Sequence, residues 1–163
     1  MTVQTTVTAP ALGQAGDLYD AGPARIHTFI ALEAIPFGKY VNIAGTTVEL
    51  PDSEAEVISG DGGIALRDPI KATGAGYAAG DAVAVLIEGM CWVPVENAVT
   101  QFGAAYVRHT AAGAEVKGSF RSDADGTDAD PAPGAKYWTA SSGGLAVVAI
   151  GQVGPRGATG PTG

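Results

Sequence analysis

Residues 80–99 read GDAVAVLIEGMCWVPVENAV, and they contain the most apolar strand candidate in the middle of the chain. The run 83–87 is nearly continuous in branched apolar residues, whereas the run 92–96 alternates. Short runs of this kind, bounded by glycine and aspartate, are typical of β-strands. Glu88 and Gly89 lie between the two runs and predict a hairpin corner. Pro94 has no N–H, which places the second strand at a sheet edge or at a bulge.

Further strand-like runs follow one another at a spacing of roughly 8–12 residues, separated by turns that contain glycine or proline. The predicted strands cover residues 25–31, 40–43, 46–50, 104–109, 137–140 and 145–150. With the central pair they predict an all-β fold, a compact β-barrel or sandwich of about eight to ten short strands. The chain has 163 residues and can bury a core without disulfides.

Three regions differ in composition. Residues 1–22 are rich in Thr, Ala, Gly and Asp, and contain too little apolar surface to offset their own ordering entropy. They are interpreted as an extended N-terminal arm or, equally, as a frayed terminus. Residues 23–150 form the predicted β-rich domain. Residues 151–163 form a tail of a different kind.

The tail carries glycine at every third position. Its sequence is GQVGPRGATGPTG, in which Pro155 and Pro161 directly follow a glycine. This is the collagen period, where glycine alone fits at the axis of three chains. Four triplets are too few to wind without support, so a trimeric globular base would have to hold the three chains together. A flexible tether is the alternative.

Composition limits the classes of partner. The net charge of −8 and the single, scattered Lys and Arg residues argue against nucleic acid as a ligand. Residues 1–6 have no basic region and no long apolar segment, so neither a signal peptide nor a membrane-spanning helix is expected. The protein is therefore expected to be made in a cytoplasm and to have no membrane partner.

No constellation of residues predicts catalysis, a cofactor or a transition metal. Cys91 is the one cysteine and is interpreted as a buried, inert thiol. His27 and His109 lack the partners of a metal pair or a catalytic triad, and are expected to be ordinary surface or partly satisfied histidines. The glycines of 60–63 lack the Lys-Ser/Thr of a phosphate loop and predict a turn. The carboxylates of 52–56 predict an acidic surface loop.

Residues 122–134, SDADGTDADPAPG, are the clearest predicted loop. Asp123, Asp125, Asp128 and Asp130 are spaced closely enough to suggest Ca²⁺ ligands. The spacing is not that of an EF-hand, because Gly126 is misplaced and no Glu closes the loop. A solvated acidic loop is therefore favoured over a calcium site.

A set of short motifs extends over most of the chain, from about residue 10 to residue 150. In order, they are GPAR at 22–25, IPFGKYV at 35–41, GIALRD at 63–68, Tyr77, GDAV at 80–83, WVPVE at 92–96, AYVR at 105–108 and GGLAVV at 143–148. Taken together and in this order, they resemble the capsid cement (head decoration) proteins of tailed bacteriophages. The collagen-like tail departs from the plain family pattern.

The resemblance implies a β-rich structural module without enzymatic activity. Such a module binds the outer face of an assembled shell of phage major capsid protein, often as a homotrimer at three-fold and quasi-three-fold positions. The expected location is the outer surface of the virion, after synthesis in the cytoplasm of the host bacterium. Two alternatives stay open: an adhesive or receptor-binding virion module on a collagen-like stalk, and a hydrolase, for which no nucleophile constellation is present.

Overall fold

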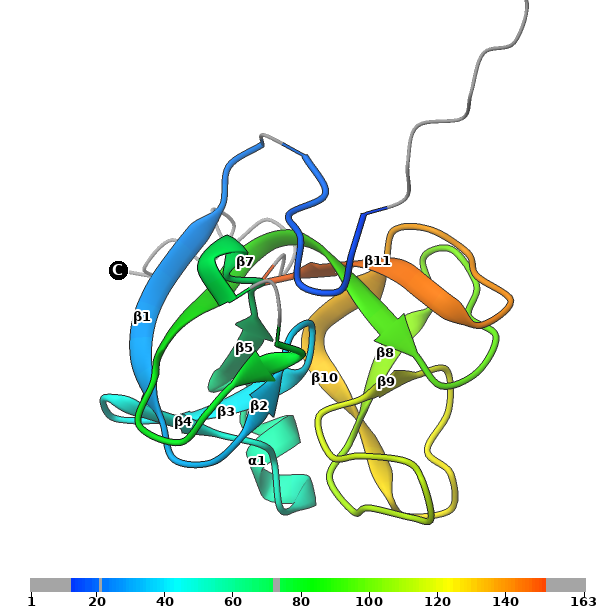
Figure 1. Ribbon diagram of the computed structural model, residues 1–163. Coiled ribbons are helices and arrows are strands. Elements are labelled where there is room, and N and C mark those ends of the chain that lie inside the picture. The colour runs from blue at the N-terminus through cyan, green and yellow to red at the C-terminus, as the bar shows by residue number, and fades with distance from the viewer. Residues whose placement is uncertain (1–12, 21, 72–73, 152–163) are drawn as a thin grey trace, which may run out of the picture.

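The computed structural model describes residues 13–20, 22–71 and 74–151 (Figure 1). Within these residues the chain forms eleven strands, one short α-helix and one 3₁₀ turn. In chain order they are β1 (Arg25–Ala31), β2 (Ile35–Pro36), β3 (Tyr40–Ala44), β4 (Thr47–Glu49), α1 (Glu54–Ile58), β5 (Gly62–Ala65), η1 (Pro69–Lys71), β6 (Gly76–Tyr77), β7 (Ala82–Val95), β8 (Ala104–Arg108), β9 (Phe120–Arg121), β10 (Ala129–Tyr137) and β11 (Gly144–Ile150). The all-β fold expected from the sequence is confirmed.

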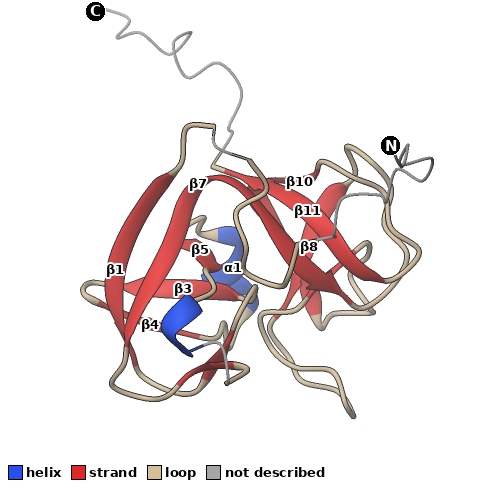
Figure 2. Cartoon of the chain, turned by 45° about the horizontal axis from the view of Figure 1, so that its top comes forward, coloured by secondary structure: helices blue, strands red, loops and turns tan. Residues whose placement is uncertain are grey.

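Strand β7 belongs to two closed rings of strands. Its first half closes a ring in the order β1-β4-β3-β5-β7, and its second half closes another in the order β7-β11-β10-β8-β9. The fold is therefore a pair of small five-stranded barrels that share one long strand. Figure 2 shows β7 passing from the half that contains β1 into the half that contains β8, β10 and β11. Strands β2 and β6 form a separate two-stranded sheet.

The predicted hairpin at Glu88 and Gly89 is wrong, because β7 continues through both residues for 14 residues. Gly89 has a φ of 139°, a backbone conformation that residues with a side chain rarely adopt. Up to this point β7 pairs with β1, and from Gly89 onward it pairs with β11 along its whole second half. The glycine redirects the strand into the second barrel without reversing it.

β7 is not an edge strand at Pro94, because β11 pairs with one side, where Pro94 is opposite Leu145, and β9 pairs with the other side at Val95. The missing N–H is tolerated for a local reason. The N–H of Trp92 donates to Asp17 on the other side of β7, so Pro94, two residues on, faces that same side. On that side Glu96, two residues further on, donates its N–H to the Phe120 carbonyl, so Pro94 falls between two partners of β7, where the absence of a donor is tolerated.

Three predicted loops are partly regular structure. Residues 54–58 form α1, whose two glutamates lie in its first turn, where the helix dipole favours negative charge. Residues 129–137, placed half in a loop by the sequence, form β10. Gly62 and Gly63 belong to β5 because strands pack closely there: a Cβ on Gly63 would lie 2.6 Å from the Leu86 carbonyl oxygen. Close packing, not a turn or a phosphate, accounts for this glycine.

The core consists of two clusters of buried apolar side chains. The larger lies in the barrel closed by β8 to β11 and extends to Tyr40 and Val57, whereas the smaller lies in the barrel of β1, β3, β4 and β5. Cys91 lies in the larger cluster and is fully buried, as predicted. Burial raises the pKa of its thiol to about 12, so the group is inert near neutral pH.

The described part of the N-terminal region packs on β7. Leu18 pairs with Cys91 in antiparallel fashion, the N–H of Gly16 donates to the Trp92 carbonyl, and the Tyr19 ring meets the Trp92 ring edge-on at 5.8 Å. Residues 13–20 thus occupy the edge of β7 that β1 occupies further along. The remainder of the predicted arm, residues 1–12, and the predicted collagen-like triplets from residue 152 onward lie outside the described residues.

Candidate interaction surfaces

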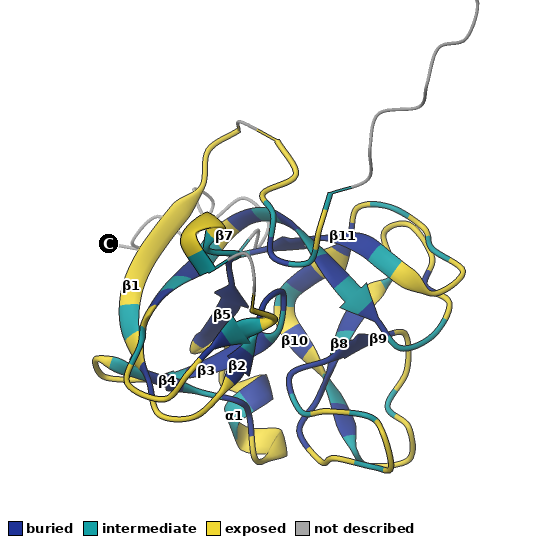
Figure 3. Cartoon of the chain, in the orientation of Figure 1, coloured by how far each residue is buried: buried dark blue, intermediate teal, exposed yellow. Residues whose placement is uncertain are grey.

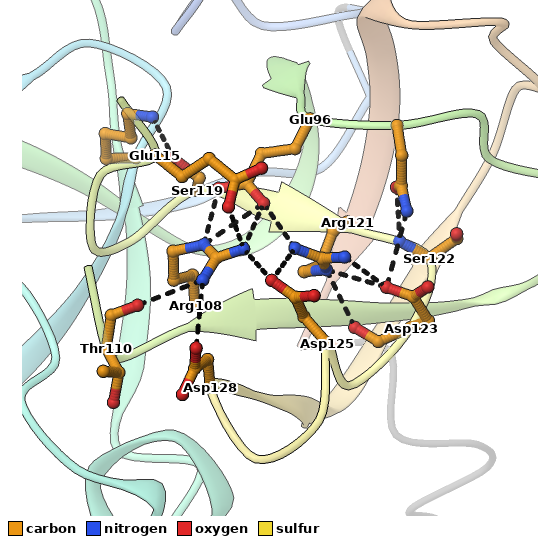
Figure 4. A network of polar contacts seen from close by, with 12 residues as sticks. Glu96, Arg108, Thr110, Glu115, Ser119, Arg121, Ser122, Asp123, Asp125 and Asp128 are labelled. Atoms are coloured by element: carbon orange, nitrogen blue, oxygen red, sulfur yellow. Dashed lines mark hydrogen bonds and ion pairs between the residues drawn. The ribbon is translucent and has the colours of Figure 1, made fainter. Parts of the chain in front are cut away.

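The most densely connected polar side chain is Arg108, at the end of β8. It is fully buried (0% exposed), an unusual position for a guanidinium group. Its Nε lies 2.9 Å from Glu96 Oε1, and its Nη2 lies 3.0 Å from Glu96 Oε2, a bidentate pair (Figure 4). Nη1 donates to the Thr110 carbonyl at 3.1 Å. Glu115 and Asp125 accept further hydrogen bonds from Nη2.

Arg121, on β9, extends this network. Its Nη1 lies 2.8 Å from Glu96 Oε2 and 2.8 Å from Asp125 Oδ2, so both arginines share these two carboxylates. Its Nη2 lies 2.6 Å from Asp123. Glu96 directly follows β7, and its N–H donates to the Phe120 carbonyl where β9 closes the second barrel. The network therefore fastens this closure, which includes a single paired position, Val95 with Phe120.

The predicted acidic loop is exposed at Asp123 and Asp125, but its carboxylates are paired. Asp123 and Asp125 pair with arginines, and Asp128 lies 3.8 Å from Arg108. Asp130 lies on β10 and contacts His109. The four aspartates are thus divided among three groups, the side chains of Arg108, Arg121 and His109. In the described residues no group of three or more His, Cys, Asp or Glu side chains has an arrangement that could hold a metal ion.

The two histidines differ in environment. His109 is 6% exposed, and its ring nitrogens contact the Thr110 hydroxyl at 3.1 Å and Asp130 at 2.9 Å. It is therefore a satisfied, buried side chain and not a surface one. His27 lies exposed on β1, with its ring centroid 6.4 Å from that of Phe29.

A hollow of about 250 Å³ lies beside the network. Its lining includes Lys39 and Ser119, and the Lys39 amine donates to the Ser119 hydroxyl. Burial lowers the pKa of Lys39, against an opposing effect of Glu96. A lysine–serine pair is one arrangement that activates a nucleophile. Ser119 is only 3% exposed, so we interpret the pair as a contact between the residue before β3 and the residue before β9.

Two aromatic side chains stand exposed together on the second barrel. Phe102 is 60% exposed and Trp138 is 40% exposed, and their rings meet edge-on at 5.6 Å. The Phe102 backbone has a φ of 64°, an uncommon conformation for a bulky residue. Its N–H donates to the Tyr137 carbonyl at 2.7 Å, which holds the residue against the end of β10. The sequence did not single out this pair, because its members are 36 positions apart.

A second exposed apolar surface lies on β1. The strand alternates: Phe29 packs on the smaller core cluster, whereas Ile26, Ile30 and the following Leu32 are 42%, 44% and 52% exposed. Figure 3 shows β1 as a largely exposed strand beside the largely buried β7. We call Ile26, Ile30 and Leu32 the β1 stripe. Isolated exposed apolar residues are ordinary, but Ile26 and Ile30 on one face of β1, with Leu32 directly after the strand, form a patch that a partner can cover.

Comparison with known proteins identifies the family of the chain. The model of a family described as structural cement protein (E217 gp24/Pam3 gp6) matches residues 3–151. The chain belongs to this family of phage cement proteins. A search of the curated proteins found no match. The resemblance stated from sequence motifs is therefore confirmed at the level of the family.

The fold of this cement protein recurs in a solved structure described as "The capsid of Myoviridae Phage XM1". The match has a TM-score of 0.73 and 19% identity, and covers 91% of this chain and 96% of that one. At this identity the similarity establishes a shared fold. Neither helical segment of the described chain has the length and apolar character needed to cross a bilayer.

Proposed function

We propose that this cement protein binds the outer surface of an assembled phage capsid as a homotrimer and stabilises the shell by bridging major capsid protein subunits. The observation that carries the proposal is the family match over residues 3–151. The proposed role requires no catalytic group or cofactor. It requires apolar contact area repeated over a lattice, because many modest contacts made at once give very slow release.

The aromatic pair Phe102 and Trp138 is the contact we assign to the capsid. Large aromatic side chains dominate the binding energy of protein interfaces when they enter a pocket on the partner. Phe102 is held exposed by a backbone conformation that disfavours a side chain, a cost of order 1–3 kcal/mol. Strain of this kind, combined with exposure of an aromatic ring, is typical of functional positions. The proposed collagen-like tail would then extend outward from the head.

Replacing Phe102 with glycine is expected to weaken capsid binding at least 10-fold, since hot-spot truncations lose about 2 kcal/mol or more. The free energy of unfolding should change by less than about 1 kcal/mol, because relief of the positive φ offsets the greater freedom of the unfolded chain. The measurements are co-sedimentation with purified, expanded, undecorated capsids and thermal unfolding of the free protein. Trp138→Ala should reduce binding in the same assay.

Ile58→Ala serves as the matched control, because Ile58 is 48% exposed but lies on α1, away from the aromatic pair. It should bind as the unsubstituted protein does.

Saturation of the capsids at a symmetric stoichiometry supports the proposed function. Light scattering on the free protein tests whether the trimer forms before the protein binds the shell. Attachment to host cells without attachment to capsids would contradict the proposal and support the adhesive alternative.

A further inference from the structure

Strand β1 has one open edge. The N–H of Ala31 donates to Asp81 on the side of β7, whereas the N–H of Ile30 donates to Thr46 on the side of β4. Successive residues of a strand face opposite sides, so Thr28 and Ile26 direct their backbone groups to the side of β4. Strand β4 pairs only with Ile30 and Ala31. Within the described chain, no strand pairs with residues 25–29 on that side.

The open edge and the β1 stripe occur in the same strand. The side chains of Ile26, Thr28 and Ile30 share the outer face, and all three residues are exposed. An added strand would satisfy the free backbone groups and place its own side chains beside this face. An uncovered edge with apolar flanking residues invites pairing between chains, which natural proteins normally prevent with charge, proline or a covering segment. Arg25 is charged and lies at the start of the open stretch, whereas residues 26–29 contain no Asp, Glu, Lys, Arg or proline.

The N-terminal sequence has the pattern that such an edge accepts. Residues 2–9 read TVQTTVTA, in which Val3, Thr5, Val7 and Ala9 alternate with Thr2, Gln4, Thr6 and Thr8. The segment is rich in β-branched residues, contains no charge, glycine or proline, and alternates with period two. It has too little apolar surface to fold alone. Residues 3–7 match in length the five residues of the open stretch 25–29.

Residues 13–20, the first described residues of the chain, lie far along the sheet from the open edge of β1. Residues 13–20 run antiparallel to β7, and Gly13 lies against the Trp92 ring. Thr28 pairs with Ala84, which is eight positions from Trp92, or roughly 26 Å measured along β7. Thr5, at the middle of the segment, is eight residues before Gly13 and reaches about 26–29 Å at full extension, so the chain's own arm would have to be fully extended over the whole path. A second copy of the chain has no such restriction.

We propose that residues 2–9 of one copy add as a strand to the open edge of β1 in a second copy. Cyclic exchange, in which each arm pairs with the next copy, closes a ring and agrees with the homotrimer proposed above. The inference extends that proposed assembly. Its test uses the free protein without capsids, so failure of arm exchange and failure of capsid binding give different results.

The test is a cross-link between two different variants of the 163-residue chain. A tagged Thr5→Cys chain and an untagged Thr28→Cys chain are co-expressed, purified by the tag and exposed to a mild oxidant. Cys91, the one native cysteine, is fully buried and does not compete. A covalent tagged–untagged heterodimer should form at least 10-fold more than with Ser142→Cys, an exposed control on the second barrel. Val3→Cys and Val7→Cys detect a register shifted by two residues.

Each outcome decides the proposal. Heterodimer yields equal to those of the Ser142 control for all three arm positions would overturn it. A double variant, Thr5→Cys/Thr28→Cys, tests the chain's own arm. If it forms an intrachain disulfide while the two single variants form no heterodimer, the proposal is overturned and the edge is assigned to the chain's own arm. Deleting residues 2–9 leaves every described residue in place, and should raise the protein concentration at which the oligomer dissociates about 10-fold. Unchanged dissociation would contradict arm exchange.

Discussion

Replacing Arg108 with alanine is expected to lower the free energy of unfolding by about 3–5 kcal/mol, because removing one partner of a buried ion pair leaves the other uncompensated. Arg108 is fully buried, and Glu96, its bidentate partner, is 11% exposed. The truncation also removes the link between β8, the end of β7 and the loop that carries Asp125. For a protein of this size, the thermal midpoint should fall by roughly 10 °C. Chemical denaturation and calorimetry measure both quantities.

Two further variants isolate the cause. Arg108→Lys keeps the charge but cannot form the planar fork that meets both oxygens of Glu96, so it should lose part of the stability. Arg25→Ala removes an exposed arginine at the start of β1 and should change the free energy by less than about 0.5 kcal/mol. If Arg108→Ala were as stable as Arg25→Ala, the ion-pair network around Arg108 and Arg121 would have no structural role.

The same network predicts how stability responds to acid. The hydrogen bond from Arg108 and the nearby charge of Arg121 hold the pKa of Asp125 below its ordinary value. The folded state therefore binds a proton at Asp125 less readily than the unfolded state does. The stabilising effect is present above a pH of about 4 and is lost as the pH falls further, through the lower pKa of the folded state. Thermal midpoints measured between pH 7 and pH 2 should show a smaller acid-induced fall in Asp125→Asn than in the unsubstituted protein.

Gly89→Val is the second substitution expected to have a large effect, a loss of about 3 kcal/mol in the free energy of unfolding. Gly89 has a φ of 139°, and a β-branched residue is strongly disfavoured there. A Cβ at this position would also lie 3.1 Å from Leu86 and 3.3 Å from the Ala24 methyl. Because β7 belongs to both barrels, strain at Gly89 should destabilise both at once, giving a single unfolding transition at lower denaturant concentration.

Gly74→Ala is the matched control for this prediction. Gly74 has an ordinary φ, and an added Cβ would meet its nearest neighbour at 3.5 Å, a normal contact distance. The control should change the free energy of unfolding by less than about 1 kcal/mol. Two separate transitions in Gly89→Val, one for each barrel, would contradict the view that β7 couples the barrels into a cooperative unit.

The strands that the sequence located correctly share a local cause. Strands β1, β3, β4, β8 and β11 each alternate or run continuously in apolar residues between glycine, proline or polar turns, and their side-chain period of two follows from strand geometry. The all-β class, the burial of Cys91 and the set of motifs typical of phage cement proteins were likewise readable without coordinates. Each depends on residue types and on spacings of a few positions.

The errors arose where distant segments decide the outcome. Gly89 permits either a hairpin corner or a bent, continuous strand, and pairing with β1 before it and β11 after it selects the strand. Pro131 and Pro133 resemble loop residues, but lie in β10, which pairs with β8 and β11 and shifts register between Pro131 and Lys136. Local propensity is weaker than the pairing and burial supplied by neighbouring strands.

The sequence alone predicted a β-rich fold and showed a resemblance to the family to which the chain belongs. Only the folded arrangement decided that Arg108 pairs with Glu96, 12 positions away, and that Arg121 shares the same carboxylate from 25 positions away. It also decided which apolar residues stay exposed. Coulomb energies and burial depend on distances through space. Those distances exist only once β7, β8 and β9 have paired to close the second barrel.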